Sequence, residues 1–301
     1  MINYVAVTQQ EIDLIEERNY HSFSIHLTPN FDGGVIPAKA RFILINKQHL
    51  VHFKQDLKQL LNAFKVIVQD IETYEEIEIM QKLSIDYYQG HFYALPLLEE
   101  KQEAGSANQQ NIIQLIAKLN DPNADFEDIS DLIISDNILS YQLLKVINCP
   151  IYRGRNEITS IQAAVVRFGL KNLKNWGTTL SLSCYSYKPQ ALFYLSLQRA
   201  MMCLKLAQFK LLDDPDSYYT AGLLSTLDAF LDTPLEELLK GILLPEVVYK
   251  GILEKEGTIG DVLSVVEKYQ TDQNAFFNEN ITSMYIDSVK ACNEMLLSLN
   301  S

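Results

Sequence analysis

Histidine is scarce in this sequence, and all five residues lie at or before His91. Imidazole is a frequent metal ligand and the most frequent general acid or base in enzymes. Any chemistry in the last two-thirds of the chain must therefore proceed without it. Cysteine is scarce too, because the four residues are widely separated and form no C-x-x-C pair. This indicates neither a disulfide framework nor a zinc site, so we expect no metal ion and no other cofactor.

Positive charge is also in short supply, since 25 Lys and Arg residues face 38 Asp and Glu residues and the net charge is −13. An acidic surface repels the phosphates of nucleic acids and of anionic lipids, so we expect neither as a partner. No apolar run approaches the roughly 20 residues of a membrane-spanning helix. The first ten residues lack the basic and then apolar pattern of a leader, so we expect a cytoplasmic protein.

The first part of the sequence alternates short β-rich runs with stretches of helical periodicity. Such alternation is typical of parallel strands joined by helices. We therefore predict a small α/β domain over residues 1–98. The predicted strands cover residues 4–7, 23–27, 42–45 and 65–68, and the predicted helices cover residues 9–18, 49–63 and 74–83.

Residues 99–110 contain no apolar side chain larger than alanine and form the predicted linker. Every later segment has helical periodicity, with short connections between segments. Asp125 and Asp136 are predicted helix N-caps, and Gly169 is a predicted helix end. We therefore predict an all-α domain over residues 111–301, and hence an α+β two-domain protein.

Three consecutive segments of the helical part resemble the HDOD domain, a catalytically silent relative of the HD phosphohydrolases. They are DISDLIISDNILSYQLLKVINCPIY from Asp128, EITSIQAAVVRFGLKNLKNW from Glu157, and YYTAGLLSTLDAFLDTPLEELLKGILL from Tyr218. The third is similar to the form of the domain that is fused behind an EAL domain. The resemblance covers roughly residues 112–270 and implies a helical signalling domain without turnover.

Residues 66–96, VIVQDIETYEEIEIMQKLSIDYYQGHFYALP, resemble the end of an EAL domain, the barrel that hydrolyses cyclic-di-GMP. Glu72-Thr73, Gln89-Gly90 and the aromatic-x-x-proline ending match that family. Gln69-Asp70 stands where the family has a glutamate-glycine pair. The resemblance therefore implies that Gln69 replaces the catalytic glutamate.

Hydrolysis by an EAL domain needs metal ions held by carboxylates from several strand ends. A closed barrel takes about 250 residues, whereas fewer than 100 residues precede the predicted linker. Neutral Gln69 cannot act as a general base. We therefore expect a degenerate, partial-barrel-like domain and no catalytic residue in it.

Gln69, Glu72 and Gln89 remain candidates for binding a cyclic dinucleotide without hydrolysis. The alternative, which we favour, is that Gln89-Gly90 only shapes a turn, since a cleft without half its wall buries little ligand. His49 and His52 lie three residues apart on one predicted helix, but no third metal ligand accompanies them.

The HD metal pair corresponds either to Ser225-Thr226 or to Leu227-Asp228, depending on the alignment, and neither pair makes a metal site. Asp228 lies among apolar residues of a predicted buried helix. A buried carboxylate requires a partner, and we expect Asp228 to accept from a helix N-terminus or a nearby basic side chain.

The candidates for protein contact are Tyr152, Arg153 and Arg155 of a basic loop, and Tyr185 and Tyr187. The loop could meet a phosphate or an acidic partner, although a plain solvated loop explains it as well. The tyrosines suit an interface or a helical core equally.

We interpret the chain as a non-catalytic bacterial signal-transduction protein that binds protein partners through its HDOD domain. One alternative is a receptor that binds cyclic-di-GMP or another nucleotide without hydrolysis. Another is a residual metal-dependent phosphodiesterase.

Overall fold

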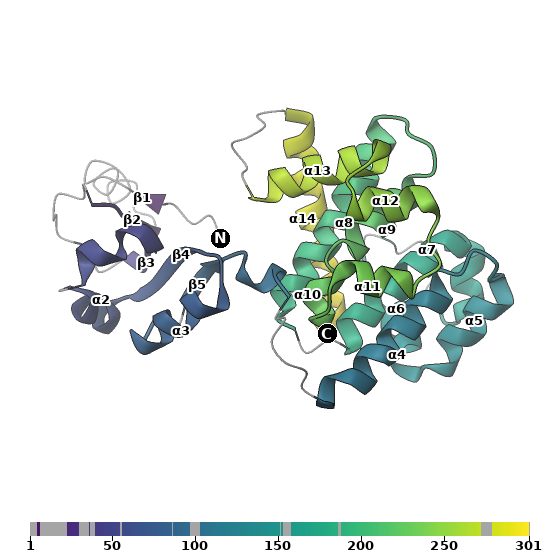
Figure 1. Ribbon diagram of the computed structural model, residues 1–301, viewed down its shortest axis with the longest axis horizontal. Helices are drawn as coiled ribbons and strands as arrows, with labels where there is room; N and C mark the ends of the chain where they lie inside the picture. The colour runs from purple at the N-terminus through teal and green to yellow at the C-terminus, as the bar shows by residue number, and fades with distance from the viewer. Residues whose placement is uncertain are drawn as a thin grey trace. The chain divides into compact units, whose positions relative to one another are not determined.

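The computed structural model describes residues 5–6, 23–29, 36, 40–54, 56–85, 87–96, 103–150, 152, 158–185, 188–271 and 279–300. The chain divides into two units, Met1–Leu95 and Pro96–Ser301 (Figure 1). The first is built on a small parallel sheet and the second is helical. The predicted order of an α/β part and an all-α part is therefore confirmed, while the finer limits 1–98 and 111–301 stay predictions.

The sheet of the first unit has the strand order β1-β2-β3-β4-β5, and every neighbouring pair is parallel. Parallel neighbours that follow one another in the chain are the arrangement predicted from the alternating pattern. The prediction missed β5, whose four residues YYQG are too short and polar to give a periodic signal. The strands are β1 Val5–Ala6, β2 Phe23–Leu27, β3 Ala40–Asn46, β4 Lys65–Ile71 and β5 Tyr87–Gly90.

The single helix predicted over residues 49–63 is wrong. A 3₁₀ helix, η1, spans Lys47–Phe53 and the α-helix α2 spans Leu57–Ala63. They are separated by a turn in which the Asp56 N–H donates to the Phe53 carbonyl at 3.0 Å. Histidine and β-branched residues, which η1 contains, are weak α-helix formers.

The predicted helix over residues 74–83 is confirmed as α3, Tyr74–Lys82, which is followed by the short 3₁₀ helix η2, Phe92–Ala94. Thr73 and Glu76 form a capping box at the start of α3, which satisfies two of its free N–H groups. The predicted helix over residues 9–18 lies outside the described residues.

One face of the sheet carries the core of this unit. Ile43, Ile45, Val66 and Val68 on that face belong to the same buried cluster as side chains of α2 and α3. Successive residues of a strand point to opposite faces, so Leu44 and its neighbours point the other way, where they are only half-buried. The face opposite the two helices is therefore the more accessible one in the described part.

The regular secondary structure described in the second unit is all helical. None of these helices is both long and apolar enough to cross a membrane. The helices are α4 Glu103–Leu119, α5 Phe126–Ser135, α6 Asn137–Ile147, α7 Ile161–Tyr185, α8 Gln190–Phe209, α9 Pro215–Leu224, α10 Leu227–Leu231, α11 Leu235–Lys240, α12 Glu246–Leu253, α13 Gly257–Thr271 and α14 Glu279–Asn300.

The predicted helix signals hold at three positions. Asp125 caps α5 in a capping box, and Asp136 accepts from the first N–H groups of α6. Gly169 has φ 79° and ψ 161°, so α7 is two helical segments that meet at a kink. Glycine adopts a positive φ at little cost, which explains why the predicted helix end falls there.

Residues 103–110 of the predicted linker are helical, because α4 begins at Glu103, and glutamate, alanine and glutamine form helices well without large apolar neighbours. One helix prediction for this unit is wrong. The helix predicted through residues 215–231 breaks between α9 and α10. There the hydroxyls of Ser225 and Thr226 donate to the carbonyls of Gly222 and Leu223, and such bonds compete with helix continuation.

Helix α8 is the centre of the helical core, since more than half of its 20 residues are buried. It packs against α9, α13 and α14 (Figure 1). Gly222 of α9 faces α8 so closely that a Cβ there would lie 2.8 Å from the Cα of Ala200. The α8–α9 contact therefore has no room for a side chain at residue 222.

We predict that Gly222→Ala lowers the free energy of unfolding by about 1–3 kcal/mol, because the added methyl forces the two helices apart. Gly241→Ala is the matched control, since a Cβ there meets its first neighbour at 3.4 Å. It should change stability by less than about 0.5 kcal/mol. Urea unfolding of both variants checks this, and equal effects would contradict the close approach.

Candidate functional site

The carboxyl ends of β3, β4 and β5 bring polar side chains together at one edge of the parallel sheet, where open α/β proteins commonly bind ligands. Gln69 near the end of β4 and Gln89 near the end of β5 meet there, and the Gln69 Nε2 donates to the Gln89 Oε1 at 3.0 Å. Among the described residues, neither the Gln69 Oε1 nor the Gln89 Nε2 has a further hydrogen-bond partner. Two of the three predicted ligand-binding residues are therefore in contact.

Glu72, the third predicted residue, belongs to a different set of contacts. It accepts from the Lys47 Nζ at 3.2 Å, and Lys47 also donates to Glu76 at 2.8 Å. The hydrogen bond to Glu76 raises the pKa of Lys47. The Glu72 side chain is 72 % exposed, so its carboxylate is a surface ion-pair partner and not part of the glutamine pair.

Asp70 follows Gln69 with φ 62°, in the left-handed region that glycine adopts most readily and that aspartate tolerates. Its carboxylate accepts from the amide of Asn46 at the end of β3. Asp70 therefore adopts, without being glycine, a conformation that glycine adopts most readily.

Two histidines that the sequence reasoning did not single out together lie beside this edge. The Nε2 of His26 and the Nδ1 of His49 are buried and have no hydrogen-bond partner among the described residues. Burial lowers the pKa of His26, His49 lowers it further, and Asp70 opposes both. Within the described ranges, no three His, Cys, Asp or Glu side chains are placed to hold one metal ion.

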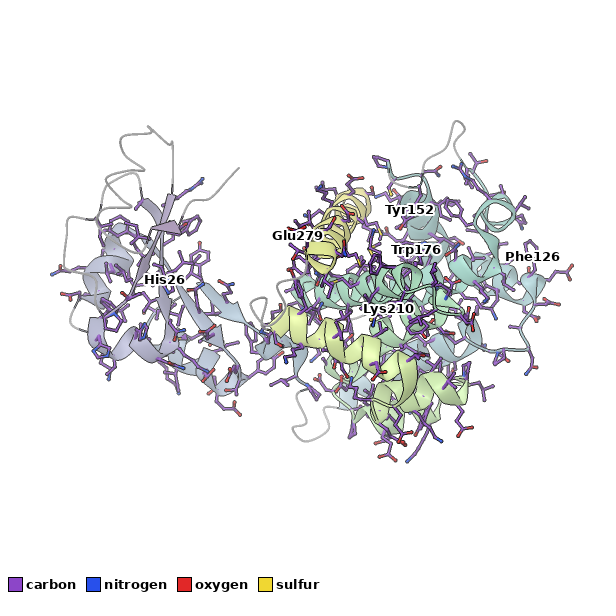
Figure 2. All side chains as sticks on the ribbon, turned by 90° about the horizontal axis from the view of Figure 1, so that it is seen from above. His26, Phe126, Tyr152, Trp176, Lys210 and Glu279 are labelled. Atoms are coloured by element: carbon purple, nitrogen blue, oxygen red, sulfur yellow. The ribbon has the colours of Figure 1, made fainter. Side chains whose placement is uncertain are left out.

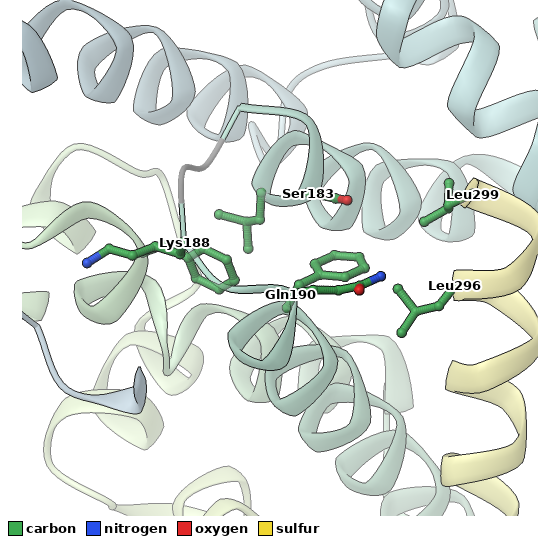
Figure 3. A pocket seen from close by; sticks show the side chains of 8 residues that line it. Ser183, Lys188, Gln190, Leu296 and Leu299 are labelled. Carbon is green, nitrogen blue, oxygen red and sulfur yellow. The ribbon is translucent and has the colours of Figure 1, made fainter. Parts of the chain in front are cut away.

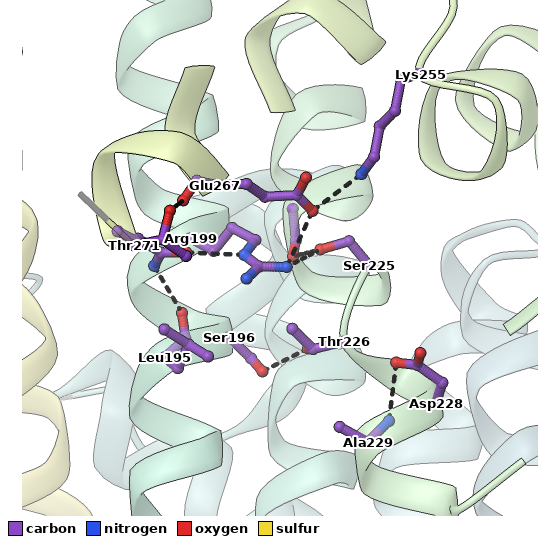
Figure 4. Close-up of polar contacts among 12 residues, drawn as sticks. Leu195, Ser196, Arg199, Ser225, Thr226, Asp228, Ala229, Lys255, Glu267 and Thr271 are labelled. Atoms are coloured by element: carbon purple, nitrogen blue, oxygen red, sulfur yellow. Dashed lines mark hydrogen bonds and ion pairs between the residues drawn. The ribbon is translucent and has the colours of Figure 1, made fainter. Parts of the chain in front are cut away.

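In the helical unit, a buried cation lies beside Ser225-Thr226, one of the two pairs that the resemblance offers for the HD position. Ser225 and Thr226 lie between α9 and α10, and Arg199 of α8 reaches this point with its Nη1 2.9 Å from the Ser225 Oγ (Figure 4). The side chain of Arg199 is 12 % exposed. Burial lowers its pKa, and the charge of Glu267 opposes that shift.

Every neighbour of this guanidinium helps to hold it. Arg199 donates to Glu267 of α13 at 3.2 Å and to the Gln270 Oε1 at 2.9 Å. Glu267 also accepts from Lys255 at 2.9 Å. A buried ion is tolerated when it is paired and hydrogen-bonded, so Arg199, Glu267, Gln270 and Ser225 form one polar network, here called the Arg199 network.

Thr226, which follows Ser225, is buried, and its hydroxyl lies 2.5 Å from that of Ser196 (Figure 4). Asp228, in the first turn of α10, accepts from the Ala229 N–H at 2.8 Å. The expectation that Asp228 meets a helix N-terminus is therefore confirmed. Burial raises the pKa of Asp228, while this hydrogen bond and the charge of Arg199 lower it.

Of the five predicted contact residues, the structure describes the side chain of Tyr152. Its ring is half-buried, with its centroid 6.1 Å from that of Phe168 and 5.5 Å from that of Trp176. A role of Tyr152 in protein contact stays a prediction. Arg153, Arg155 and Tyr187 lie outside the described residues, as does the side chain of Tyr185.

A cavity of about 220 Å³ opens where α7, α8, α10 and α14 meet (Figure 3). Its charged residue, Lys188, donates to Asp232 at 2.6 Å. Ligand pockets usually measure about 300–1,000 Å³, so this one is small and its charge is neutralised. It is lined by Leu182, Ser183, Lys188, Gln190, Phe193, Phe230, Leu296 and Leu299.

We predict that Arg199→Met lowers the free energy of unfolding by about 2–3 kcal/mol, because Gln270 and Ser225 lose the donor that Arg199 supplies and Glu267 keeps only Lys255. Lys240→Met removes an exposed pair with Glu236 and should cost less than about 0.5 kcal/mol. Urea unfolding at constant salt compares the two. If the Arg199 and Lys240 variants lose equal stability, the network is not buried.

The raised pKa of Asp228 predicts a pH dependence. The folded protein holds this proton more tightly than the unfolded chain, so the contribution of Asp228 to stability declines as the pH rises through its carboxyl range. Asp228→Asn retains the acceptor for the Ala229 N–H and cannot titrate. The unfolding free energy of the wild type, relative to that of Asp228→Asn, should therefore increase as the pH falls from 7 to about 4. A constant or decreasing difference would contradict the burial.

The sequence matches the family described as "HDOD domain" over residues 107–234. It is 30 % identical over 211 residues to "Cyclic di-GMP phosphodiesterase CdgJ" of Vibrio cholerae, with 68 % of this chain and 48 % of CdgJ covered. It is 24 % identical over 242 residues to "Uncharacterized protein YuxH" of Bacillus subtilis, with 76 % and 59 % covered. The chain thus spans about half the length of the curated relatives it matches.

Solved structures resemble the chain more remotely. A protein from Shewanella amazonensis is 14 % identical with a TM-score of 0.47, and 65 % of this chain and 98 % of that one are covered. An HDOD domain protein of unknown function from Geobacter sulfurreducens is 18 % identical with a TM-score of 0.36, and 63 % and 78 % are covered. On the family match and the similarity in sequence, the chain is homologous to CdgJ and contains an HDOD domain within its helical unit.

Proposed function

We propose that this protein is a signalling adaptor that binds protein partners through its HDOD domain and catalyses no reaction. The observation that carries the proposal is the guanidinium of Arg199 beside Ser225, which belongs to one of the two pairs that the resemblance offers for the HD position. A divalent metal ion placed there would meet a buried positive charge, and like charges repel strongly where water is excluded. The hydroxyls of Ser225 and Thr226 are already engaged, and this part of the sequence has no histidine.

The first unit is proposed to be a degenerate EAL-like domain. Its five consecutive parallel strands are what a piece of a parallel barrel wall would look like, although a complete barrel has eight. Gln69 occupies the place of the catalytic glutamate in the resemblance and cannot ionise. The left-handed Asp70 supports the same correspondence, because the family has glycine at that point.

A second candidate function is a receptor for cyclic-di-GMP. The pairing of Gln69 with Gln89 favours it. The Gln69 Oε1 remains as an acceptor and the Gln89 Nε2 as a donor at the carboxyl edge of the sheet, in the part that the structure describes. The unpartnered nitrogens of His26 and His49 offer further polar atoms beside it. The relative CdgJ carries the name of a cyclic di-GMP phosphodiesterase, which suggests the ligand to test.

We predict that the full chain, incubated with cyclic-di-GMP and Mg²⁺ or Mn²⁺, releases no linear product, because Gln69 cannot activate water. Gln69→Glu is the matched variant and should stay inactive as well, since one carboxylate does not rebuild a metal site. Chromatography of the nucleotides provides the measurement. Turnover by the wild type that Glu72→Ala abolishes would overturn the adaptor proposal.

Calorimetry with the same nucleotide separates adaptor from receptor. The adaptor proposal expects no heat of binding at ligand concentrations up to about 1 mM. A dissociation constant of that size corresponds to a binding free energy of only about −4 kcal/mol. Saturable heat in the wild type, with an affinity at least tenfold weaker in both Gln69→Ala and Gln89→Ala, would establish the receptor instead. Lys58→Ala, on the exposed surface of α2, is the control that should change nothing.

A further inference from the structure

A second cavity of the helical unit, of about 130 Å³, is lined by four aromatic residues together with Met201, Leu204 and three polar side chains. Four rings line it, those of Tyr152, Phe168, Trp176 and Tyr219, and they come from α7, α9 and the segment before α7. Trp176 and Tyr219 are almost wholly buried. Figure 2 shows Tyr152 and Trp176 close together in this unit.

The rings stand at steep angles to one another and do not stack. Tyr152 is inclined by 81° to Phe168 and by 69° to Trp176, and the Trp176 and Tyr219 centroids are 6.5 Å apart at 59°. Rings inclined in this way form adjoining walls. The electron-rich face of an aromatic ring attracts cations within about 6 Å, so an enclosure of several rings favours an organic cation.

A carboxylate completes the cavity. Asp216, in the first turn of α9, is half-buried and lines the wall. One of its oxygens accepts from the Asn175 Nδ2 at 3.2 Å, and no described residue donates to the other one. The charge of Lys171 acts on it, but Lys171 is 67 % exposed and pairs with Asp214 at 2.5 Å. The cavity therefore holds a negative charge that lacks a close partner.

Several other polar groups of the cavity are already in use. The Asn175 carbonyl accepts from the Thr220 hydroxyl at 3.1 Å, and the Asn172 Nδ2 donates to the Phe168 carbonyl at 2.7 Å. The Tyr219 hydroxyl lies 2.8 Å from that of Thr179. A guanidinium brings five N–H donors and a primary ammonium brings three, and each donor needs an acceptor in so small a cavity. A cation with no N–H group needs only the ring faces and the charge of Asp216.

We propose that this cavity binds a quaternary methylammonium group, which the four rings surround and Asp216 balances. Such groups are recognised through cation–π contacts with aromatic walls. The volume suits a head group and not a whole drug-sized ligand, so the remainder of the molecule extends into solvent. The same head group occurs in choline-type small molecules and in trimethylated lysine side chains of proteins. This inference does not depend on the adaptor role.

Trp176 makes the test direct, because it is the only tryptophan in the sequence and lines the cavity. Titration of the full chain with tetramethylammonium chloride should change the tryptophan fluorescence in a saturable way, whereas sodium chloride at equal ionic strength should not. Choline, a trimethyllysine peptide and its unmethylated form follow as separate arms. Tighter binding of choline identifies a small-molecule ligand, and tighter binding of the methylated peptide identifies a protein side chain.

Two cavity variants and one control variant test whether the cavity is the binding site. Asp216→Asn removes the charge at constant shape and should weaken tetramethylammonium binding about tenfold, whereas Asp213→Asn, an exposed change of equal charge, should leave it unchanged. Phe168→Leu should weaken binding as well, and its circular dichroism melt checks that the fold persists. The absence of saturable fluorescence change up to about 50 mM, or equal affinity of wild type and Asp216→Asn, would overturn the proposal.

Discussion

The buried guanidinium of Arg199 is the interaction on which the helical unit depends. It connects α8 to the end of α9 through Ser225 and to α13 through Glu267 and Gln270. A charge so enclosed is stable only while its partners surround it, so the three elements must keep their places. The close approach of α9 to α8 at Gly222 and the Arg199 network act on the same helix pair, and together they hold the end of α9 against α8.

The first unit presents a comparable replacement at its own candidate site. In the proposed correspondence with an EAL barrel, catalysis needs a carboxylate at the end of this strand. Gln69 has an amide there instead, and its Nε2 donates to Gln89. Asp70 uses its carboxylate on Asn46, and Glu72 uses its own on Lys47. In both units, polar side chains at the candidate site bond mainly to each other. This pattern favours recognition over turnover and underlies the proposed adaptor role.

Sequence patterns predicted the features that local contacts determine. Asp125 and Asp136 bond within their own first helical turns, and Gly169 adopts a conformation that depends on its missing side chain. The absence of histidine after residue 91 excluded an imidazole site. The same absence did not predict that Arg199 lies beside Ser225, because the partners that hold Arg199 are distant in the sequence: Glu267 is 68 residues away. The ring packing of Tyr152 and the pairing of Gln69 with Gln89 also depend on contacts distant in the sequence.

The central claim of the proposed function is that the guanidinium of Arg199 lies beside the Ser225-Thr226 pair of the proposed HD position and keeps metal ions out. Titration of the full chain with Mn²⁺, followed by electron paramagnetic resonance of the free ion, tests it most directly. The account predicts no stoichiometric Mn²⁺ bound to the helical unit, so wild type and Glu267→Gln should deplete the free signal to the same extent. One Mn²⁺ per chain in the wild type that Glu267→Gln abolishes would contradict the account.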